Sequence, residues 1–137
     1  MIRDATEADI PRILEMGAKF FRAMNRHEVG EYSEAAAEST TRLLIENGIL
    51  LVSENGMVGG LVYPFYMTGR LTAQEFFWWS EDGKGRELMD AFEQKAKEMG
   101  AETIQMIALE SLDPQRVGKI YERAGYKPAE RSYIKVV

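Results

Sequence analysis

Two glycines lie two positions apart between an aromatic segment and a helical pattern. Gly83 and Gly85 alternate with Lys84 and Arg86, and residues 86–99 carry apolar side chains at helical spacing. Where a strand enters a helix through such a loop, unpaired backbone N–H groups and the helix dipole both favour an anion. The two cations could add charge-assisted contacts to a phosphate group. Because turn and cap glycines are common, the loop alone predicts either an anion site or an ordinary strand-to-helix turn.

The spacing of this loop argues against two common phosphate-binding motifs. A P-loop needs Gly-Lys-Ser/Thr at the start of its helix, and that sequence is not present here. The dinucleotide fingerprint needs a third glycine, at a position that Leu88 occupies. ATP and NAD are therefore disfavoured as ligands of the loop.

Side chains that could act as nucleophiles or metal ligands are scarce. The chain has no cysteine and a single histidine, His27, so disulfides, thiol chemistry and Cys/His zinc sites are not expected. His27 lies in a polar stretch, where an exposed position is favoured over a catalytic one. We expect no metal, and any nucleophile must come from the substrate.

Composition and charge indicate an ordinary soluble protein. The chain has 137 residues, of which 45% are hydrophobic and 28% charged, so we expect one domain over residues 1–137. No apolar run reaches the ~20 residues of a membrane span, and Arg3 and Asp4 lie where a signal peptide would be apolar. We therefore expect a cytoplasmic protein without a membrane partner. A net charge of -5 and the lack of a basic block disfavour nucleic acid as a partner.

Four helices are expected to position the loop. Apolar residues recur at helical spacing from Ile10 to Met24. Ser33 caps a second helix that ends at Asn47 and Gly48, and the third covers residues 86–99. Asp113 and Pro114 open the fourth helix, which ends at Gly125.

The strands are expected to form one sheet, giving an α/β (α+β) fold. Asn55 and Gly56 are the favoured dipeptide for a two-residue hairpin turn. Trp78 and Trp79 are adjacent, so on a strand they face opposite sides of the sheet. The predicted strands cover residues 1–3, 49–53, 57–66, 73–79, 103–109, 126–127 and 133–136.

Four segments in order resemble the GNAT superfamily of N-acetyltransferases. They are Ile-Arg-x-Ala-Thr-x-x-Asp-Ile at residues 2–10, the Asn-Gly hairpin at 55–56, Gly-Lys-Gly-Arg-x-Leu-Met at 83–89, and Ile-Tyr-Glu-Arg-Ala-Gly-Tyr at 120–126. The last segment is the most specific, and the resemblance spans nearly the whole chain. The chain is particularly similar to compact members encoded by bacteriophages.

The resemblance implies the GNAT fold with acetyl-CoA as cosubstrate. The expected sheet is mixed, mostly antiparallel and twisted, with about six to seven strands flanked by about four helices. Acetyl-CoA would lie where the strands at 73–80 and 103–109 splay apart, with its pyrophosphate on the loop and its pantetheine arm paired to the first of these strands. The residues implied to bind it are Phe77, Trp78, Ser80, Asp82, Gly83, Lys84, Gly85, Arg86 and Glu87.

Two positions depart from the family pattern. Ser80 stands where the loop usually begins with Gln or Arg, and the segment between strand and helix is shorter than usual. Asp113 or Pro114 stands where an Asn often opens the last helix.

The resemblance implies that Tyr121 is the general acid. Direct acetyl transfer needs a neutral amine, donors for the carbonyl oxygen and a proton for the departing CoA thiolate. A phenol with a pKa of about 10 is protonated at neutral pH and can supply that proton. The structural interpretation is that Tyr121 packs in the core with its hydroxyl on a carbonyl.

Glu75 is the candidate general base, because it lies on the strand that approaches the reaction centre. In a regular strand it would share a face with Phe77 and Trp79. The alternative is a solvated carboxylate at a strand end.

The sequence indicates the pocket for the amine acceptor less clearly than the cofactor site. Candidates for its pocket are Arg26, Tyr32, Tyr63 and Tyr66. The resemblance implies a primary amine as the acceptor, on a small molecule or on a protein lysine or N-terminus, and we expect the setting to be a bacterial or phage-infected cell.

Two further expectations concern partners. The competing interpretation is a catalytically weak or inactive GNAT-fold module that acts on a protein partner, which Ser80 and the short loop favour. Tyr133, Ile134, Val136 and Val137 form an apolar end through which a homodimer is possible, because GNAT proteins often dimerise through their C-terminal strands.

Overall fold

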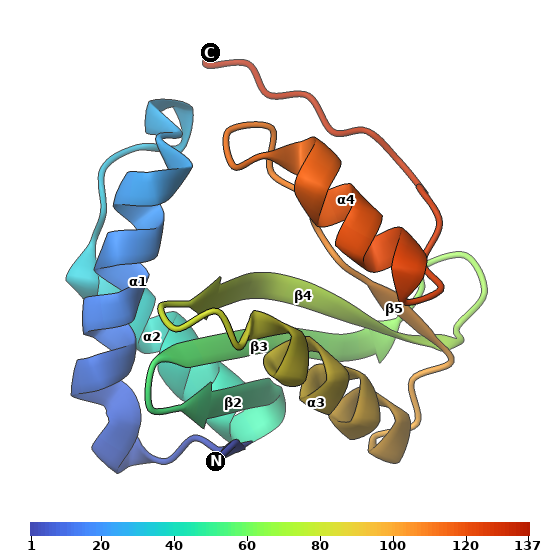
Figure 1. Ribbon diagram of the computed structural model, residues 1–137, viewed down its shortest axis with the longest axis horizontal. Helices are drawn as coiled ribbons and strands as arrows, with labels where there is room; N and C mark the ends of the chain where they lie inside the picture. Colours follow the sequence, from blue (N-terminus) through green and yellow to red (C-terminus); the bar gives the residue numbers. More distant parts are fainter.

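The computed structural model describes residues 1–137 and contains one five-stranded sheet with four α-helices (Figure 1). The strands are β1 (Arg3–Asp4), β2 (Ile49–Ser53), β3 (Gly56–Pro64), β4 (Leu71–Ser80) and β5 (Thr103–Gln105). The helices are α1 (Ile10–Met24), α2 (Glu34–Asn47), α3 (Gly85–Glu98) and α4 (Pro114–Arg123), with 3₁₀ turns at Glu7–Asp9 and His27–Val29. None of the helices combines the length and the apolar character needed to cross a membrane.

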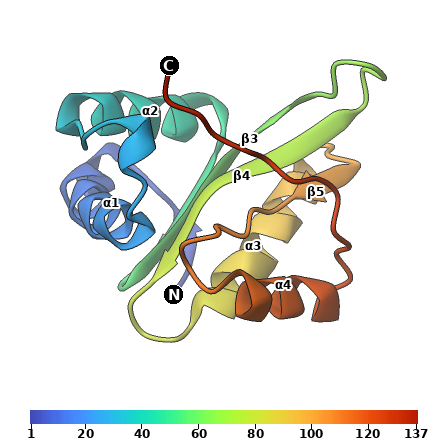
Figure 2. The ribbon, with the colours of Figure 1, turned by 90° about the horizontal axis from the view of Figure 1, so that it is seen from above.

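The sheet has the order β1-β2-β3-β4-β5, with antiparallel pairs up to β4 and a parallel pair between β4 and β5. The prediction of a mixed, mostly antiparallel sheet with four helices is confirmed. The sheet has five strands instead of six or seven. It is layered between helices, with α1 and α2 on one side and α3 and α4 on the other (Figure 2).

The two predicted C-terminal strands, at residues 126–127 and 133–136, are wrong. Residues 126–137 form no strand, and every residue from Lys127 onward is exposed. A strand needs a partner, but β5 ends at Gln105 and offers only a short edge. Pro128 also lacks the N–H that pairing would use.

The local start signals read from the sequence are confirmed. The Ser33 hydroxyl accepts a hydrogen bond of 3.2 Å from the Ala36 N–H at the start of α2. The Asp113 carboxylate accepts one of 3.4 Å from the Arg116 N–H at the start of α4.

A β-bulge changes which side chains share a face of β4. Gly59 lies opposite Phe77 and Gly60 opposite Glu75, so Phe76 has no partner on β3. A Cβ on Gly60 would collide with the carbonyl of Gln74, so the two backbones can approach this closely only at glycine.

The bulge overturns the expectation for Glu75. Phe77 and Trp79 pack with the core beneath α1 and α2, whereas Ala73 and Trp78 pack with the core beneath α3. Glu75, two residues after Ala73, therefore faces the α3 and α4 side and not the side of Phe77 and Trp79. Trp78 and Trp79 lie on opposite sides, as predicted.

Candidate functional site

The site lies where β4 and β5 separate. Residues 72–74 of β4 pair with residues 103–105 of β5, and β4 then continues to Ser80 while the chain after Gln105 leaves the sheet. The resemblance implied two splayed strands here, at residues 73–80 and 103–109; the first is present as β4, whereas the second ends at Gln105 instead of residue 109. Glu75, Ile107 and Tyr121 lie beside the point of separation.

Glu75 is a buried carboxylate rather than a solvated one. Only 4% of the residue is exposed, and its Oε1 accepts a hydrogen bond of 2.9 Å from the Ile107 N–H. Burial raises the pKa of Glu75 to about 7, although the backbone hydrogen bond opposes this shift. Such a carboxyl changes its charge near neutral pH, which is the property required of a general base.

Tyr121 approaches the same residue from α4. It is 7% exposed, and its hydroxyl donates a hydrogen bond of 2.6 Å to the Ile107 carbonyl. Burial, and then the charge of Glu75, raise the pKa of Tyr121, so the phenol stays protonated at neutral pH. This hydrogen bond is the one that the structural interpretation of Tyr121 predicts, and its role as the general acid stays a prediction.

Glu75 and Tyr121 therefore hold opposite sides of one residue. The first accepts the N–H of Ile107 and the second donates to its C=O. No sequence motif indicated Ile107, because it takes part through its backbone. The two candidate catalytic groups are thus brought together by the segment that follows β5.

Trp78 connects this pair to the glycine loop. Its indole N–H donates a hydrogen bond of 2.8 Å to the Gly85 carbonyl at the start of α3. Its ring centre lies 5.8 Å from that of Tyr121. The side chain of Phe77 faces away from the site, so any contact of Phe77 with a cofactor would use the backbone.

The glycine loop leads directly into α3. Gly83 has a φ of +77°, a conformation that other residues rarely adopt, and Gly85 is the first residue of the helix. The first N–H groups of α3 have no acceptor within the helix, as at any helix start. No side chain caps this helix. The loop therefore keeps the backbone donors that an anion site requires.

An acidic side chain also lies in the loop. The Asp82 carboxylate accepts hydrogen bonds from the Lys84 N–H at 3.0 Å and the Ser80 hydroxyl at 2.9 Å. These bonds, the one from Lys84 first, lower the pKa of Asp82. Arg86 pairs with Asp90 at 3.2 Å, and Glu87 is exposed in the first turn. One of the loop's backbone donors is thus already used, by a negatively charged group.

Glu81 anchors the beginning of the loop to α1, a role that no sequence motif indicated. Its carboxylate lies 2.9 Å from the Arg12 guanidinium and 3.2 Å from the Lys19 ammonium. The Trp79 indole N–H donates to it at 3.1 Å. These partners, Arg12 first and then Trp79, lower the pKa of Glu81 to about 2.

The acceptor candidates do not gather at the site. Tyr32 donates a hydrogen bond of 3.3 Å to the Leu14 carbonyl, and Arg26 lies 4.0 Å from Glu28. Tyr63 and Tyr66 are exposed, toward the end of β3 and just beyond it. His27 is also exposed, as expected.

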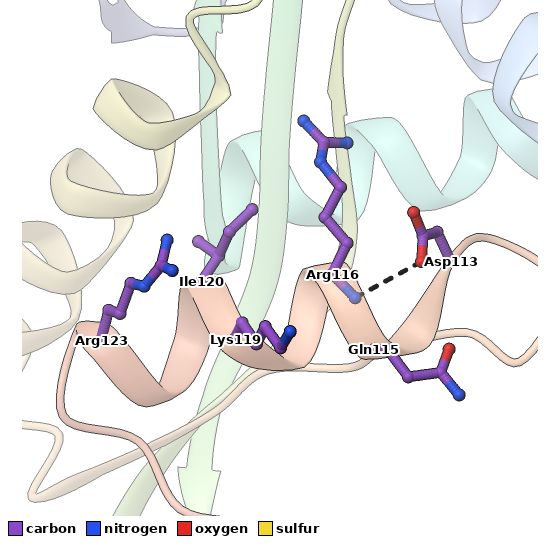
Figure 3. Close-up of a pocket in the computed structure, with 6 residues that line it drawn as sticks. All are labelled: Asp113, Gln115, Arg116, Lys119, Ile120 and Arg123. Atoms are coloured by element: carbon purple, nitrogen blue, oxygen red, sulfur yellow. Dashed lines mark hydrogen bonds between the residues drawn. The ribbon is translucent and has the colours of Figure 1, made fainter.

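A groove of about 500 Å³ lies along α4 (Figure 3). In this view Arg116, Ile120 and Arg123 extend toward the side of the helix where the sheet and α3 lie. The lining residues are Asp113, Gln115, Arg116, Lys119, Ile120 and Arg123.

No protein-family model matches the sequence, and no curated protein matches it. Solved structures do match over almost the full chain, and several are acetyltransferases. The chain therefore has the GNAT fold, as the sequence predicted. This likeness defines the fold, and the site must define the activity.

Three of these structures show the range of proteins that share the fold. A ribosomal-protein-alanine N-acetyltransferase from Brucella melitensis biovar Abortus 2308 is 20% identical, with 98% of each chain covered and a TM-score of 0.73. AAC(6')-Iy, in complex with a bisubstrate analogue of CoA and acetylneamine, is 9% identical over 98% of this chain and 95% of its own, with a TM-score of 0.75. A transcriptional regulator from Bacillus halodurans C-125 is 23% identical over 98% and 97%, with a TM-score of 0.76.

Proposed function

We propose that the protein is an N-acetyltransferase that moves an acetyl group from acetyl-CoA to a primary amine by direct attack. The observation that carries the proposal is the meeting of Glu75 and Tyr121 on Ile107, at the point where β4 and β5 separate. The proposal treats residues 1–137 as one catalytic domain.

In this mechanism Glu75 takes a proton from the attacking ammonium or amine, directly or through water. With a pKa raised to about 7, its carboxylate form is available at neutral pH and is basic enough to accept the proton. The amine nitrogen forms a bond to the acetyl carbon while the bond from carbon to sulfur breaks. The bulge at Phe76 leaves backbone groups of β4 unpaired beside this position.

Tyr121 supplies the proton for the departing thiolate. Its hydroxyl must turn from the Ile107 carbonyl toward the sulfur, exchanging one acceptor for another. The elevated pKa keeps the proton on the phenol until the thiolate appears.

The residues of the loop suit the phosphates of CoA in part. The first N–H groups of α3 and the ammonium of Lys84, which has no ion-pair partner, would hold the pyrophosphate. The carboxylate of Asp82 opposes this binding by like charge. Trp78 would line the path of the pantetheine arm toward Tyr121.

The amine acceptor and the setting are further parts of the proposal. Structures with the same fold include an aminoglycoside acetyltransferase and a ribosomal-protein-alanine N-acetyltransferase, so amines of both small molecules and proteins are reasonable acceptors. We place the protein in the cytoplasm of a bacterium or phage-infected cell. The exposed apolar side chains of Tyr133, Ile134 and Val136 support a homodimer.

The Asp82 carboxylate favours one competing function, a GNAT-fold module that binds a protein partner and has little or no activity. In that case the loop would be self-capped, and the Tyr121 hydroxyl would stay on Ile107. The two functions differ in whether acetyl-CoA binds at all.

Isothermal titration with acetyl-CoA tests the proposal. The wild type should bind saturably, and a Gly83→Glu variant should not, because its carboxylate would enter the phosphate position. Gly83→Ala is the matched control, since it introduces the same backbone strain without the charge. An absence of binding to the wild type would contradict the proposal and favour the interaction module. Binding would be followed by a screen of amines.

A further inference from the structure

Tyr121 is the only buried residue of α4. The other residues of the helix are exposed or half-buried, so α4 rests on the sheet mainly through this one side chain. The Tyr121 hydroxyl is held on the Ile107 carbonyl at 2.6 Å. In the proposed mechanism the hydroxyl leaves that carbonyl to protonate the departing thiolate. A contact other than this hydrogen bond must then hold the ring in place.

Two aromatic rings flank the ring of Tyr121. The ring centres of Trp78 and Tyr126 lie 5.8 Å and 5.7 Å from it, within the range of roughly 4.5–7 Å at which aromatic pairs are favourable. Tyr126 belongs to the turn that ends α4, where its N–H donates to the Tyr121 carbonyl at 3.0 Å, so it moves with the helix. Trp78 lies on β4 and is therefore the neighbour that belongs to the sheet.

The indole of Trp78 is anchored at the start of α3. Its N–H donates to the Gly85 carbonyl at 2.8 Å, and the side chain packs against the core beneath α3. A Cβ on Gly85 would lie 3.3 Å from the indole nitrogen, closer than an ordinary contact. The small size of Gly85 therefore matters to the indole as well as to an anion at the loop.

We propose that Trp78 is a positioning residue, which keeps the ring of Tyr121 fixed relative to the start of α3 while the hydroxyl changes its acceptor. Acetyl transfer needs the cosubstrate and the proton donor aligned together, and a displacement of about 1 Å can cost up to ~100-fold in rate. The indole lies against both the helix start that would hold the pyrophosphate and the side chain that would protonate the thiolate. This role rests on the proposed function and adds to the place of Trp78 beside the pantetheine arm.

Trp79 offers a matched comparison on the other face of the sheet. Its indole N–H donates to the Glu81 carboxylate at 3.1 Å, and its ring centre lies 5.6 Å from that of Phe20. The two tryptophans therefore make the same kinds of contact, a hydrogen bond near the loop and an aromatic pair. Only the aromatic neighbour of Trp78 is a candidate catalytic residue.

The test measures kcat at saturating acetyl-CoA with an accepted amine, below the melting temperature of every variant. Trp78→Leu should lower kcat about tenfold, because the ring of Tyr121 loses its neighbour on the sheet. Trp78→Phe keeps a ring at this position and should recover kcat to within about threefold of the wild type. Trp79→Leu removes the same kinds of contact on the other face and should leave kcat unchanged, although both leucine variants should lose stability.

A double-mutant cycle separates an effect through Tyr121 from a general one. In a Tyr121→Phe background, which lacks the proton donor, Trp78→Leu should change kcat by less than about twofold. Gly85→Ala displaces the indole without removing it, so it should lower kcat in the wild type and have no further effect on kcat in Trp78→Leu.

Other results would contradict this role. An unchanged kcat in Trp78→Leu, or an equal loss of kcat with and without the Tyr121 hydroxyl, would overturn it while acetyl transfer stands. An equal loss of kcat in Trp79→Leu would assign both tryptophans to stability alone. If the wild type does not bind acetyl-CoA in the isothermal titration, the proposed function fails and the role of Trp78 fails with it, a result that is seen before any Trp78 variant is made.

Discussion

The two faces of the sheet bury different kinds of side chain. The core beneath α1 and α2 is made of aliphatic and aromatic side chains, including Leu44, Met16 and Phe77, and holds no buried ionisable group. The face beneath α3 and α4 contains Glu75 and Tyr121 as well as apolar residues. The candidate catalytic residues therefore lie on the opposite face of the sheet from the fully apolar core, because burying an unpaired charge in an apolar core costs free energy.

Tyr126 strengthens the contrast. Its ring lies 5.7 Å from that of Tyr121, and burial, followed by the nearby carboxylate of Glu93, raises the pKa of its phenol. Taking a polar group out of water costs free energy. The α3 and α4 side of the sheet therefore takes ionisable groups out of water at a cost in stability, as expected of a functional site.

The largest expected effect on stability comes from the apolar face. Leu44→Ala should lower the free energy of unfolding by about 2–5 kcal/mol, because Leu44 is fully buried and the change leaves a cavity. Urea unfolding measures this loss. At a temperature where the variant stays folded, its rate of acetyl transfer should equal that of the wild type. A large fall in kcat with little loss of stability would contradict the separation of the two faces.

Glu75, on the α3 and α4 side of the sheet, should make the stability of the protein depend on pH. Because the folded-state pKa of Glu75 is raised to about 7 from 4.5, the native state binds the extra proton, so the contribution of Glu75 to stability is greatest below about pH 4.5 and is lost as the pH rises to about 7. The loss should reach about 3 kcal/mol relative to Glu75→Gln, measured by urea unfolding at several pH values. Parallel curves for the two proteins would contradict the buried state of Glu75.

Tyr121→Phe should separate the two interpretations of its hydroxyl. Loss of the bond to the Ile107 carbonyl should cost about 1 kcal/mol of stability in either case. Loss of a general acid should also lower kcat about 100-fold with a small change in KM. An unchanged kcat would assign Tyr121 a structural role only.

The sequence predicted most of the fold because its signals are local. The caps at Ser33 and Asp113 act within a few residues, and the helices follow from periodicity. The hairpin turn was predicted one residue too late, because Ser53 pairs with Gly56 and the two turn residues are Glu54 and Asn55. The strands predicted at residues 126–127 and 133–136 do not form, because an apolar segment becomes a strand only where another strand is available to pair with it.

The candidate site was only partly predictable. The glycine loop and Tyr121 stand in recognisable motifs, and Glu75 was placed on the right strand. Its burial and its face were not predictable, because the bulge at Phe76 depends on the register between two strands. The contact of both groups with Ile107 joins segments far apart in the chain and involves only backbone.

The smallest expected effect concerns the loop. Asp82→Asn should raise the affinity for acetyl-CoA by roughly two- to fivefold, since the amide can keep the bond from the Lys84 N–H while the negative charge is lost. Glu98→Gln, at the other end of α3, is the control and should have no effect. Weaker binding by Asp82→Asn would show that the carboxylate organises the loop for its ligand rather than opposing it.

The central claim is that Glu75 is the general base of an acetyl transfer at the point where β4 and β5 separate. Its most direct test is the pH profile of kcat/KM with acetyl-CoA and an accepted amine, for the wild type, Glu75→Gln and the control Glu54→Gln. The wild-type rate should rise to a plateau with a pKa of about 7. Glu75→Gln alone should lose this pKa and lower the rate about 10²–10³-fold. A profile that keeps the same pKa and rate in Glu75→Gln would contradict a role for Glu75 as the general base.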